Sequence, residues 1–244
     1  MTEQIDISII IPAFNESKRL PVFLDRVITY CQKSDKAYEI IVVDDGSSDA
    51  TYEVATAYKK KFINFQVIRN TQNSGKGYSV KTGFFSARGD IQAFLDADGS
   101  TQPEEIEKNI HYFKEGYDIV VGSRVLTGED QVIKTRWHRK FMGTIFNYFV
   151  RSFLFDDIKD TQCGFKMFKK DIIEPLFSRI YLQRFGFDIE ILYLAHKMGY
   201  RVKEKAVSWH HVSGSKVNIL TDSLNMFINI LQIKKWHCTQ KKIK

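Results

Sequence analysis

Two aspartates one residue apart, Asp96 and Asp98, carry the clearest chemical signature in this chain. They directly follow the strand-like run 92–95, and the period-two geometry of an extended chain turns both carboxylates the same way. Carboxylate oxygens in this arrangement suit one Mg²⁺ or Mn²⁺ ion. The alternative is a simple turn, because Asp and Gly favour turns for local reasons, and the D-x-D-G motif alone does not choose between the two.

Three other polar or glycine-rich loops also follow strand-like runs, and they favour a site. They have the sequences PAFNE at 12–16, DDGS at 44–47 and NSGKG at 73–77. Ligands of open α/β sheets bind beyond the carboxyl ends of the strands, so we expect these loops to meet Asp96 and Asp98 in one cleft. Two familiar phosphate-binding motifs are excluded: the P-loop fails because Gly77 follows Lys76, and the dinucleotide fingerprint fails at Val80.

The elements that must position these loops alternate along the first half of the chain. Short β-branched runs lie at 7–11, 39–43, 65–69, 91–95 and 117–121, separated by stretches with helical spacing. This rhythm predicts βαβ units. After Arg124 the pattern changes to a strand at 165–168, a helix at 188–198, a strand at 201–207 and an amphipathic stretch at 219–236. We therefore predict an α/β fold whose mostly parallel sheet carries helices on both faces, with amphipathic helices in the C-terminal half.

Length and composition are those of an ordinary globular protein. The 244 residues, 43% of them hydrophobic and 27% charged, can bury a core without disulfide or metal staples. The longest uncharged stretch, 223–233, is too short to cross a bilayer, and the N-terminus has no signal-peptide pattern. Three widely spaced cysteines fit a reducing compartment. We expect a cytoplasmic protein that is neither secreted nor membrane-spanning.

The net charge of +7 favours anionic partners, among which are nucleic acid, anionic lipid and phosphorylated substrates. Nucleic acid is disfavoured because the lysines are scattered, the strand-end cleft is acidic and no base-stacking motif occurs. Two segments, 134–150 and 219–244, place cations beside an apolar helical face, as helices on a membrane surface do. The alternative is that each apolar face packs on the core. We expect peripheral attachment to the cytoplasmic face of an anionic membrane.

Eight motifs in register make the chain resemble the family 2 glycosyltransferases with the GT-A fold. They are IIIPAFNE, VVDDGSSD, NSGKG, DADG, GSR, DTQCGFK, FDIE and GSK. The last four resemble one branch of that family, the dolichyl-phosphate glucosyltransferases. The resemblance implies a single GT-A domain over 1–218, in which 1–124 bind the nucleotide sugar and 125–218 the acceptor. Residues 219–244 would form an amphipathic helix and a basic tail.

The resemblance also implies roles for individual residues. The implied nucleotide-sugar ligands are Pro12, Phe14, Glu16, Val42, Asp44, Asp45, Lys76, Asp96, Ala97 and Asp98, of which Asp96 and Asp98 would also hold Mg²⁺ or Mn²⁺. The implied catalytic set is Asp96, Asp98, Arg124 and Asp188. The cations expected to face the acceptor phosphate are Arg124, Arg136, Arg139, Lys166 and Lys216.

The expected reaction moves a sugar from a nucleotide sugar to dolichyl or polyprenyl phosphate, with inversion at the anomeric carbon. UDP-glucose is the first expected donor and UDP-GlcNAc the second. A phosphomonoester is already anionic at neutral pH, so its attack needs no general base. Asp188 then has an open role: it could orient a cation or the sugar, or simply favour a helix start. The alternative acceptor is a glycan or protein hydroxyl, from which Asp188 would have to remove a proton.

Overall fold

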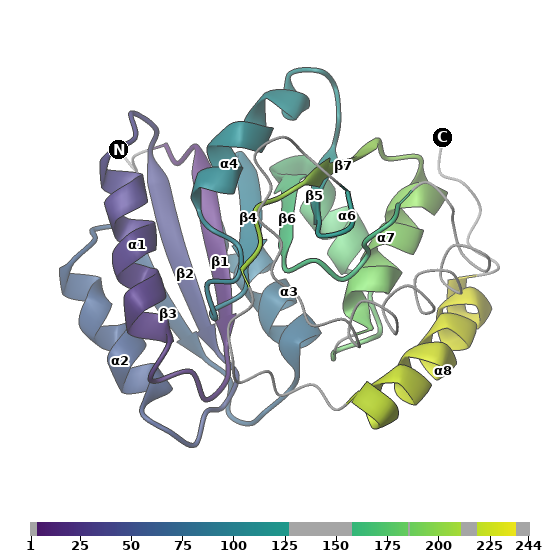
Figure 1. Cartoon of the computed structure of the whole chain (residues 1–244), viewed down its shortest axis with the longest axis horizontal. Helices are drawn as coiled ribbons and strands as arrows, with labels where there is room; N and C mark the ends of the chain where they lie inside the picture. Colours follow the sequence, from purple (N-terminus) through teal and green to yellow (C-terminus); the bar gives the residue numbers. More distant parts are fainter. Residues whose placement is uncertain (1–3, 127–157, 185, 211–218, 238–244) are drawn as a thin grey trace.

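A computed structural model describes residues 4–126, 158–184, 186–210 and 219–237 of the protein (Figure 1). Its centre is a seven-stranded sheet in the order β3-β2-β1-β4-β6-β5-β7. Only β6, among these strands, runs antiparallel to its neighbours, which confirms the mostly parallel sheet. The strands are β1 (Ile7–Ala13), β2 (Tyr38–Asp44), β3 (Phe65–Arg69), β4 (Ile91–Leu95), β5 (Ile119–Ser123), β6 (Phe165–Lys169) and β7 (Val202–Ala206).

Helices cover both faces of the sheet, as the sequence predicts. Because side chains alternate along a strand, Ile9 and Ile11 of β1 join the core beneath one layer, while Ile10 joins the core beneath the other. The first layer contains α1 (Leu20–Gln32), α2 (Thr51–Ala57), α4 (Glu104–Asn109) and the short turns η1 (Tyr58–Lys60) and η2 (Ile110–Phe113). The second contains α3 (Lys76–Ser86), η3 (Lys170–Ile172), α6 (Ile173–Phe177) and α7 (Phe187–Met198).

The last helix, α8 (Ile219–His237), lies on the outer side of α7, far from β3 (Figure 1). Ile230 and Ile233 are buried in the core that α7 shares. Ile228 and Leu231, by contrast, are 44% and 48% exposed. Among the described residues, no helix combines the length and apolar character needed to cross a bilayer.

Candidate active site

The loops after β1 and β2 form one wall at the carboxyl edge of the sheet. Asn15, which has a positive φ of 53°, links them: its backbone N–H donates to Ser47 Oγ at 2.9 Å and its Oδ1 accepts from the backbone N–H of Ser48 at 2.8 Å. The backbone N–H of Glu16 donates to Thr51 Oγ1 at 2.7 Å. These crossed hydrogen bonds fix the two loops relative to each other before any ligand binds.

The first loop also brings Pro12, Phe14 and Glu16 to this wall. Pro12 and Phe14 are half-buried at the end of β1. Arg19 pairs with the carboxylate of Glu16, with Nε 2.6 Å from Oε2, and this hydrogen bond raises the pKa of Arg19 against the opposing effect of burial. The wall thus offers apolar surface next to a compensated charge, which suits a base and a ribose more than a bare phosphate.

Two of the expected ligands from β2 lie deeper than the sequence analysis places them. Val42 is fully buried between Ile11 of β1 and Val67 of β3, so its side chain packs beneath the wall and presents no surface to a nucleotide. Asp44 is also buried; its Oδ1 accepts from the backbone N–H of Ser47 at 3.3 Å. A β-branched residue in a strand with partners on both sides belongs to the core.

Asp45 shapes the neighbouring loop at 73–75. One oxygen accepts from Asn70 Nδ2 at 2.8 Å and from the backbone N–H of Ser74 at 3.0 Å, and the other accepts from the backbone N–H of Gly75 at 2.8 Å. Both oxygens are therefore occupied by the protein itself. Asp45 positions the glycine-rich loop and is itself buried.

Arg69 is a residue of this wall that the sequence analysis did not select. Its Nε lies 3.3 Å from Asp44 Oδ2, and its guanidinium stacks 4.8 Å from the ring centroid of Tyr52. Arg69 pairs with Asp44 in the β2–β3 register. The signal that could have identified Arg69 from the sequence is a basic residue at the end of a predicted strand. Such a position is informative because ligands bind beyond the ends of the strands.

Asp96 and Asp98 follow β4 in the middle of this edge, beside Lys76. Lys76 Nζ lies 2.6 Å from Asp96 Oδ1, and Asp98 Oδ1 accepts from the backbone N–H of Ser100 at 2.9 Å. Burial raises the pKa of Asp98, and the nearby carboxylate of Asp96 raises it further. Burial opposes the charge of Lys76, but the carboxylates of Asp96, Asp188 and Asp98 outweigh it and raise its pKa. The site therefore holds crowded negative charge that Lys76 partly compensates.

This pair of carboxylates fits a divalent metal shared with a substrate. Burial and, after it, the nearby carboxylate of Asp96 raise the pKa of Asp98, and a bound cation would favour its ionised form. Within the described residues, no group of three or more His, Cys, Asp or Glu converges on one point. Magnesium is commonly bound by one or two carboxylates together with phosphates of the substrate. Asp96 and Asp98 supply the protein part of such a shell, and Ala97 is buried between them.

The second half of the chain reaches the site through β6, which lies beside β4 with Phe165 opposite Leu95. The backbone N–H of Asp96 donates to the carbonyl of Gly164 at 3.3 Å. A Cβ built on Gly164 would lie 1.9 Å from Asp96 Oδ2 and 2.4 Å from its Cγ. Only glycine at this position lets the carboxylate of Asp96 rest against the chain that precedes β6.

We expect Gly164→Ala to reduce metal-dependent activity about 100-fold by turning the Asp96 carboxylate away, since misplacing a reacting group by about 1 Å can cost that much. The clash involves a short side chain that can rotate, so the melting temperature should change little. Mn²⁺ affinity, transfer rate and melting temperature of the variant would be measured together. An alanine variant with normal Mn²⁺ affinity would show that the close approach at Gly164 is not required.

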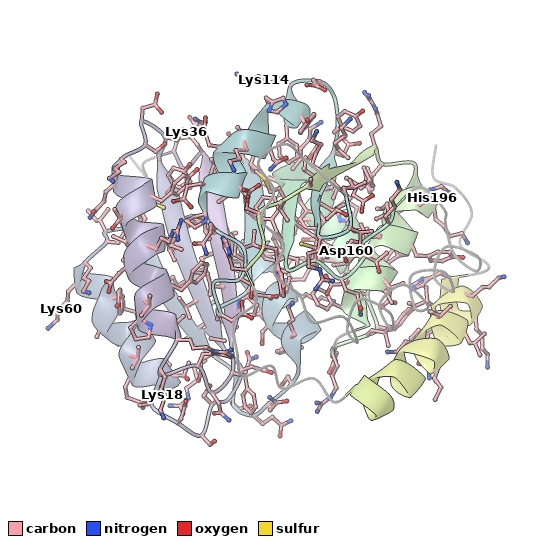
Figure 2. The ribbon with its side chains drawn as sticks, in the orientation of Figure 1. Lys18, Lys36, Lys60, Lys114, Asp160 and His196 are labelled. Carbon is pink, nitrogen blue, oxygen red and sulfur yellow. The ribbon has the colours of Figure 1, made fainter. Side chains whose placement is uncertain are left out.

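Arg124 and Asp160 form a bidentate ion pair near Asp96. Arg124 Nε and Nη2 lie 2.8 and 2.9 Å from the two oxygens of Asp160, and the backbone N–H of Arg124 donates to Oδ2 at 2.9 Å. Burial opposes ionisation of Asp160, but the guanidinium of Arg124 lowers its pKa. Trp209 flanks the guanidinium at 5.9 Å. Figure 2 shows Asp160 near the middle of the molecule, whereas the labelled lysines lie at its periphery.

Lys166 and Asp188 form a second pair, and both are buried. Lys166 Nζ lies 2.6 Å from Asp188 Oδ1 and donates to the carbonyl of Cys163 at 2.8 Å. The ammonium group is enclosed, so Lys166 holds Asp188 in place and does not face an acceptor phosphate in this structure. Of the roles left open for Asp188, the geometry displays two: it pairs with a basic residue, and it lies in the first turn of α7. Arg136, Arg139, Lys216 and the basic apolar segment 134–150 lie outside the described residues.

The carboxyl edge of this sheet carries a wall that suits a nucleoside, together with the D-x-D pair Asp96 and Asp98. This is the architecture of a GT-A glycosyltransferase. Residues 8–177 match the model of the family described as Glycosyl transferase family 2. The chain belongs to this family and is a glycosyltransferase, as the motifs predict.

Several curated relatives are similar over almost the whole chain. The chain is 37% identical to a dolichyl-phosphate beta-glucosyltransferase of Dictyostelium discoideum, with 95% of this chain and 75% of that protein covered. It is 35% identical to the enzyme of the same name from Mus musculus (96% and 76% covered) and 33% identical to that of Saccharomyces cerevisiae (95% and 75%). The resemblance seen in the motifs is therefore confirmed over both halves of the chain.

Solved structures show the same fold at low sequence identity. Glucosyl-3-phosphoglycerate synthase from Mycobacterium tuberculosis, crystallised with Mn²⁺, UDP and glucosyl-3-phosphoglycerate, superposes with a TM-score of 0.70 at 19% identity, covering 93% of this chain and 79% of that one. TarS of S. aureus superposes with a TM-score of 0.60 at 15% identity, covering 97% and 73%. These structures confirm the GT-A fold.

Proposed function

We propose that this protein transfers glucose from UDP-glucose to dolichyl or polyprenyl phosphate, with inversion at the anomeric carbon. The names of its relatives support the lipid phosphate and the glucose, and a fold neighbour was crystallised with Mn²⁺ and UDP-glucose. The observation that carries the proposal is that Asp96, beside Asp98, interacts with two cations, Lys76 at 2.6 Å and Arg124. UDP-GlcNAc remains the second donor to test.

The donor side of this site is built to hold a nucleoside diphosphate. The wall of Pro12, Phe14 and Glu16 would receive the nucleoside, and Asp96 and Asp98 would hold the divalent metal against the diphosphate. Such a metal offsets the charge that develops on a departing diphosphate. Lys76 adds a positive charge 2.6 Å from Asp96, where it would help to offset the charge of the diphosphate.

The acceptor side favours a phosphate over a hydroxyl group. Asp160 holds the Arg124 guanidinium through two hydrogen bonds, which orients a cation that can attract and align an anionic nucleophile. Asp188 already neutralises the buried ammonium of Lys166. A carboxylate engaged in this way is poorly placed to take a proton from a hydroxyl acceptor, whereas a phosphate dianion needs no such base.

The decisive experiment measures transfer of radiolabelled sugar into organic-extractable lipid, with short polyprenyl phosphates, Mg²⁺ or Mn²⁺ and a panel of UDP- and GDP-sugars. We expect labelled lipid with UDP-glucose, in which the sugar phosphate is β-linked. The double variant Asp188→Asn/Lys166→Met removes both buried charges at once, which avoids leaving one unpaired. It should retain transfer to a phosphate within about tenfold, because proton removal is not part of that reaction.

Two outcomes would contradict this assignment. Lipid labelling that disappears in the double variant, while UDP binding and melting temperature stay normal, would indicate that Asp188 acts as a base. Absence of labelled lipid with every donor, despite metal-dependent UDP binding, would move the acceptor to a glycan or protein hydroxyl.

We also propose that the protein works at the cytoplasmic face of an anionic membrane and that α8 contacts it. Ile228 and Leu231 are exposed on the side of α8 opposite its buried Ile230 and Ile233, and exposed Lys234 and Lys235 follow one turn later. Apolar side chains next to basic ones are typical of helices that lie in a membrane interface.

We expect the protein to float with phosphatidylserine vesicles at low salt and to lose most of this association in Ile228→Ser/Leu231→Ser. Ile63, which is 91% exposed at the end of the chain segment before β3, provides the matched control, because Ile63→Ser removes an exposed isoleucine elsewhere. Equal flotation of both variants, or no flotation of the unmodified protein, would contradict membrane contact through α8.

A further inference from the structure

The C-terminal turn of α8 is joined to α7 by a polar contact that the proposed chemistry does not use. His237 and Glu190 are both fully buried, and Nε2 of His237 lies 2.7 Å from Glu190 Oε1. The His237 ring packs 5.5 Å from the ring of Tyr181 and 6.3 Å from that of Tyr193, and Lys197 Nζ donates to the His237 carbonyl. A buried pair of this kind is costly to desolvate, so a role beyond packing has to be considered.

Glu190 also holds the segment that precedes α7. Its carboxylate accepts from the backbone N–H of Tyr181 at 3.1 and 3.2 Å and from that of Leu182 at 2.8 Å. Without this carboxylate, two partly buried backbone donors would lose their acceptor, which is unfavourable where water cannot fully replace it. Glu190 therefore fixes the course of residues 181–183.

Residues 182–183 in turn support the first turn of α3, which carries Lys76. The carbonyl of Gln183 accepts from the backbone N–H of Tyr78 at 3.0 Å. A Cβ built on Gly75 would lie 2.5 Å from that carbonyl oxygen, and one built on Gly77 would lie 2.9 Å from it. The two glycines on either side of Lys76 thus press directly against this segment, so its position determines where the Lys76 backbone lies.

A continuous set of contacts therefore runs from α8 to the donor side of the site. We infer that Glu190, oriented by His237, is a positioning residue for Lys76: it fixes residues 181–183, and these fix the turn from which Lys76 reaches Asp96. This inference rests on the proposed donor role of Lys76. It also makes docking of the last turn of α8 a condition for a correctly formed donor site.

The first test measures the backbone directly and needs no substrate. Hydrogen exchange at the Tyr78 amide should become about tenfold faster in Glu190→Gln, because local opening of the 181–183 segment releases the acceptor of that amide. His237→Phe keeps a ring between Tyr181 and Tyr193 but removes Nε2, and it should show a smaller effect in the same direction. Val27→Ala, a buried substitution in α1 beneath the other face of the sheet, is the control for general loss of stability.

The second test asks whether Glu190 acts through Lys76. Glu190→Gln should raise KM for the donor about tenfold with a smaller change in kcat. In a Lys76→Ala background the same substitution should change KM less than about twofold, because the effects of coupled residues are not additive. Equal effects in both backgrounds, or a Tyr78 amide that exchanges as in Val27→Ala, would overturn the inference. If no sugar is transferred by the unmodified protein, the proposed function fails, whereas the exchange result still decides the role of Glu190.

Discussion

Replacing Asp98 by asparagine should lower sugar transfer at least about 1,000-fold while leaving the fold intact. Loss of one group that stabilises developing charge at an active site typically costs about 100- to 1,000-fold, and Asp98 is one of only two carboxylates that this stretch offers to a metal. The asparagine oxygen can still accept from the backbone N–H of Ser100, which lies 2.9 Å from Asp98 Oδ1. The loop geometry is therefore preserved while the charge is removed.

The stability of this variant should be unchanged or higher at neutral pH. Burial and the neighbouring Asp96 raise the pKa of Asp98 in the folded protein, so ionised Asp98 opposes folding above its ordinary pKa, and asparagine removes that cost. Melting temperature, Mn²⁺ affinity and transfer rate would be compared with Asp25→Asn, which removes an exposed aspartate of α1 that pairs with Lys61. Mn²⁺ affinity equal to that of the unmodified protein would contradict the role of Asp98 as a ligand.

The carboxyl edge of the sheet could be predicted in advance because its residues sit in short loops after consecutive parallel strands. For this reason Asp96, Lys76 and the PAFNE loop lie at the same edge of the sheet. The bounds of β3 and β4 also agree with those that the hydrophobic pattern predicts. The burial of Val42 could not be predicted, because a β-branched residue two positions before an aspartate looks the same in sequence whether its side chain faces a ligand or the core.

Contacts made by the second half could not be predicted, because they depend on where β6 lies. Its antiparallel position between β4 and β5 brings Gly164 against Asp96 and Asp160 against Arg124. Local propensity gives the existence of a strand but not its neighbours. The cations of this half, Lys166 among them, could therefore be recognised as candidates for an anion site, while the carboxylate that each one pairs with could not.

We expect Asp160→Asn to lower both stability and activity strongly. Removing one partner of a buried ion pair typically costs about 3–5 kcal/mol, because the other charge stays without compensation. The side chain of Arg124 is 33% exposed whereas that of Asp160 is 2% exposed, so solvent can screen part of the loss and we expect about 3 kcal/mol. Transfer should fall at least about 100-fold, since Arg124 would no longer be held in one orientation.

The stability effect of this substitution should also depend on pH in a defined direction. The guanidinium of Arg124 lowers the pKa of Asp160 in the folded protein despite its burial. A carboxyl group with a lowered folded pKa stabilises the protein above its unfolded pKa, about 4 for aspartate, and this stabilisation is lost as the pH falls through the folded value. The free energy of unfolding, measured with denaturant, should differ most between the unmodified protein and Asp160→Asn at pH 7. This difference should shrink below about pH 4.

A double variant separates the contribution of this pair to folding from its contribution to activity. Arg124→Met/Asp160→Leu replaces both charges with apolar groups, a change that is often neutral for stability when the volume is kept. We expect it to recover most of the stability lost in Asp160→Asn but none of the transfer activity, because the cation that aligns the acceptor phosphate is gone. Recovery of activity together with stability would mean that Asp160 and Arg124 only support the fold, and that another cation aligns the acceptor.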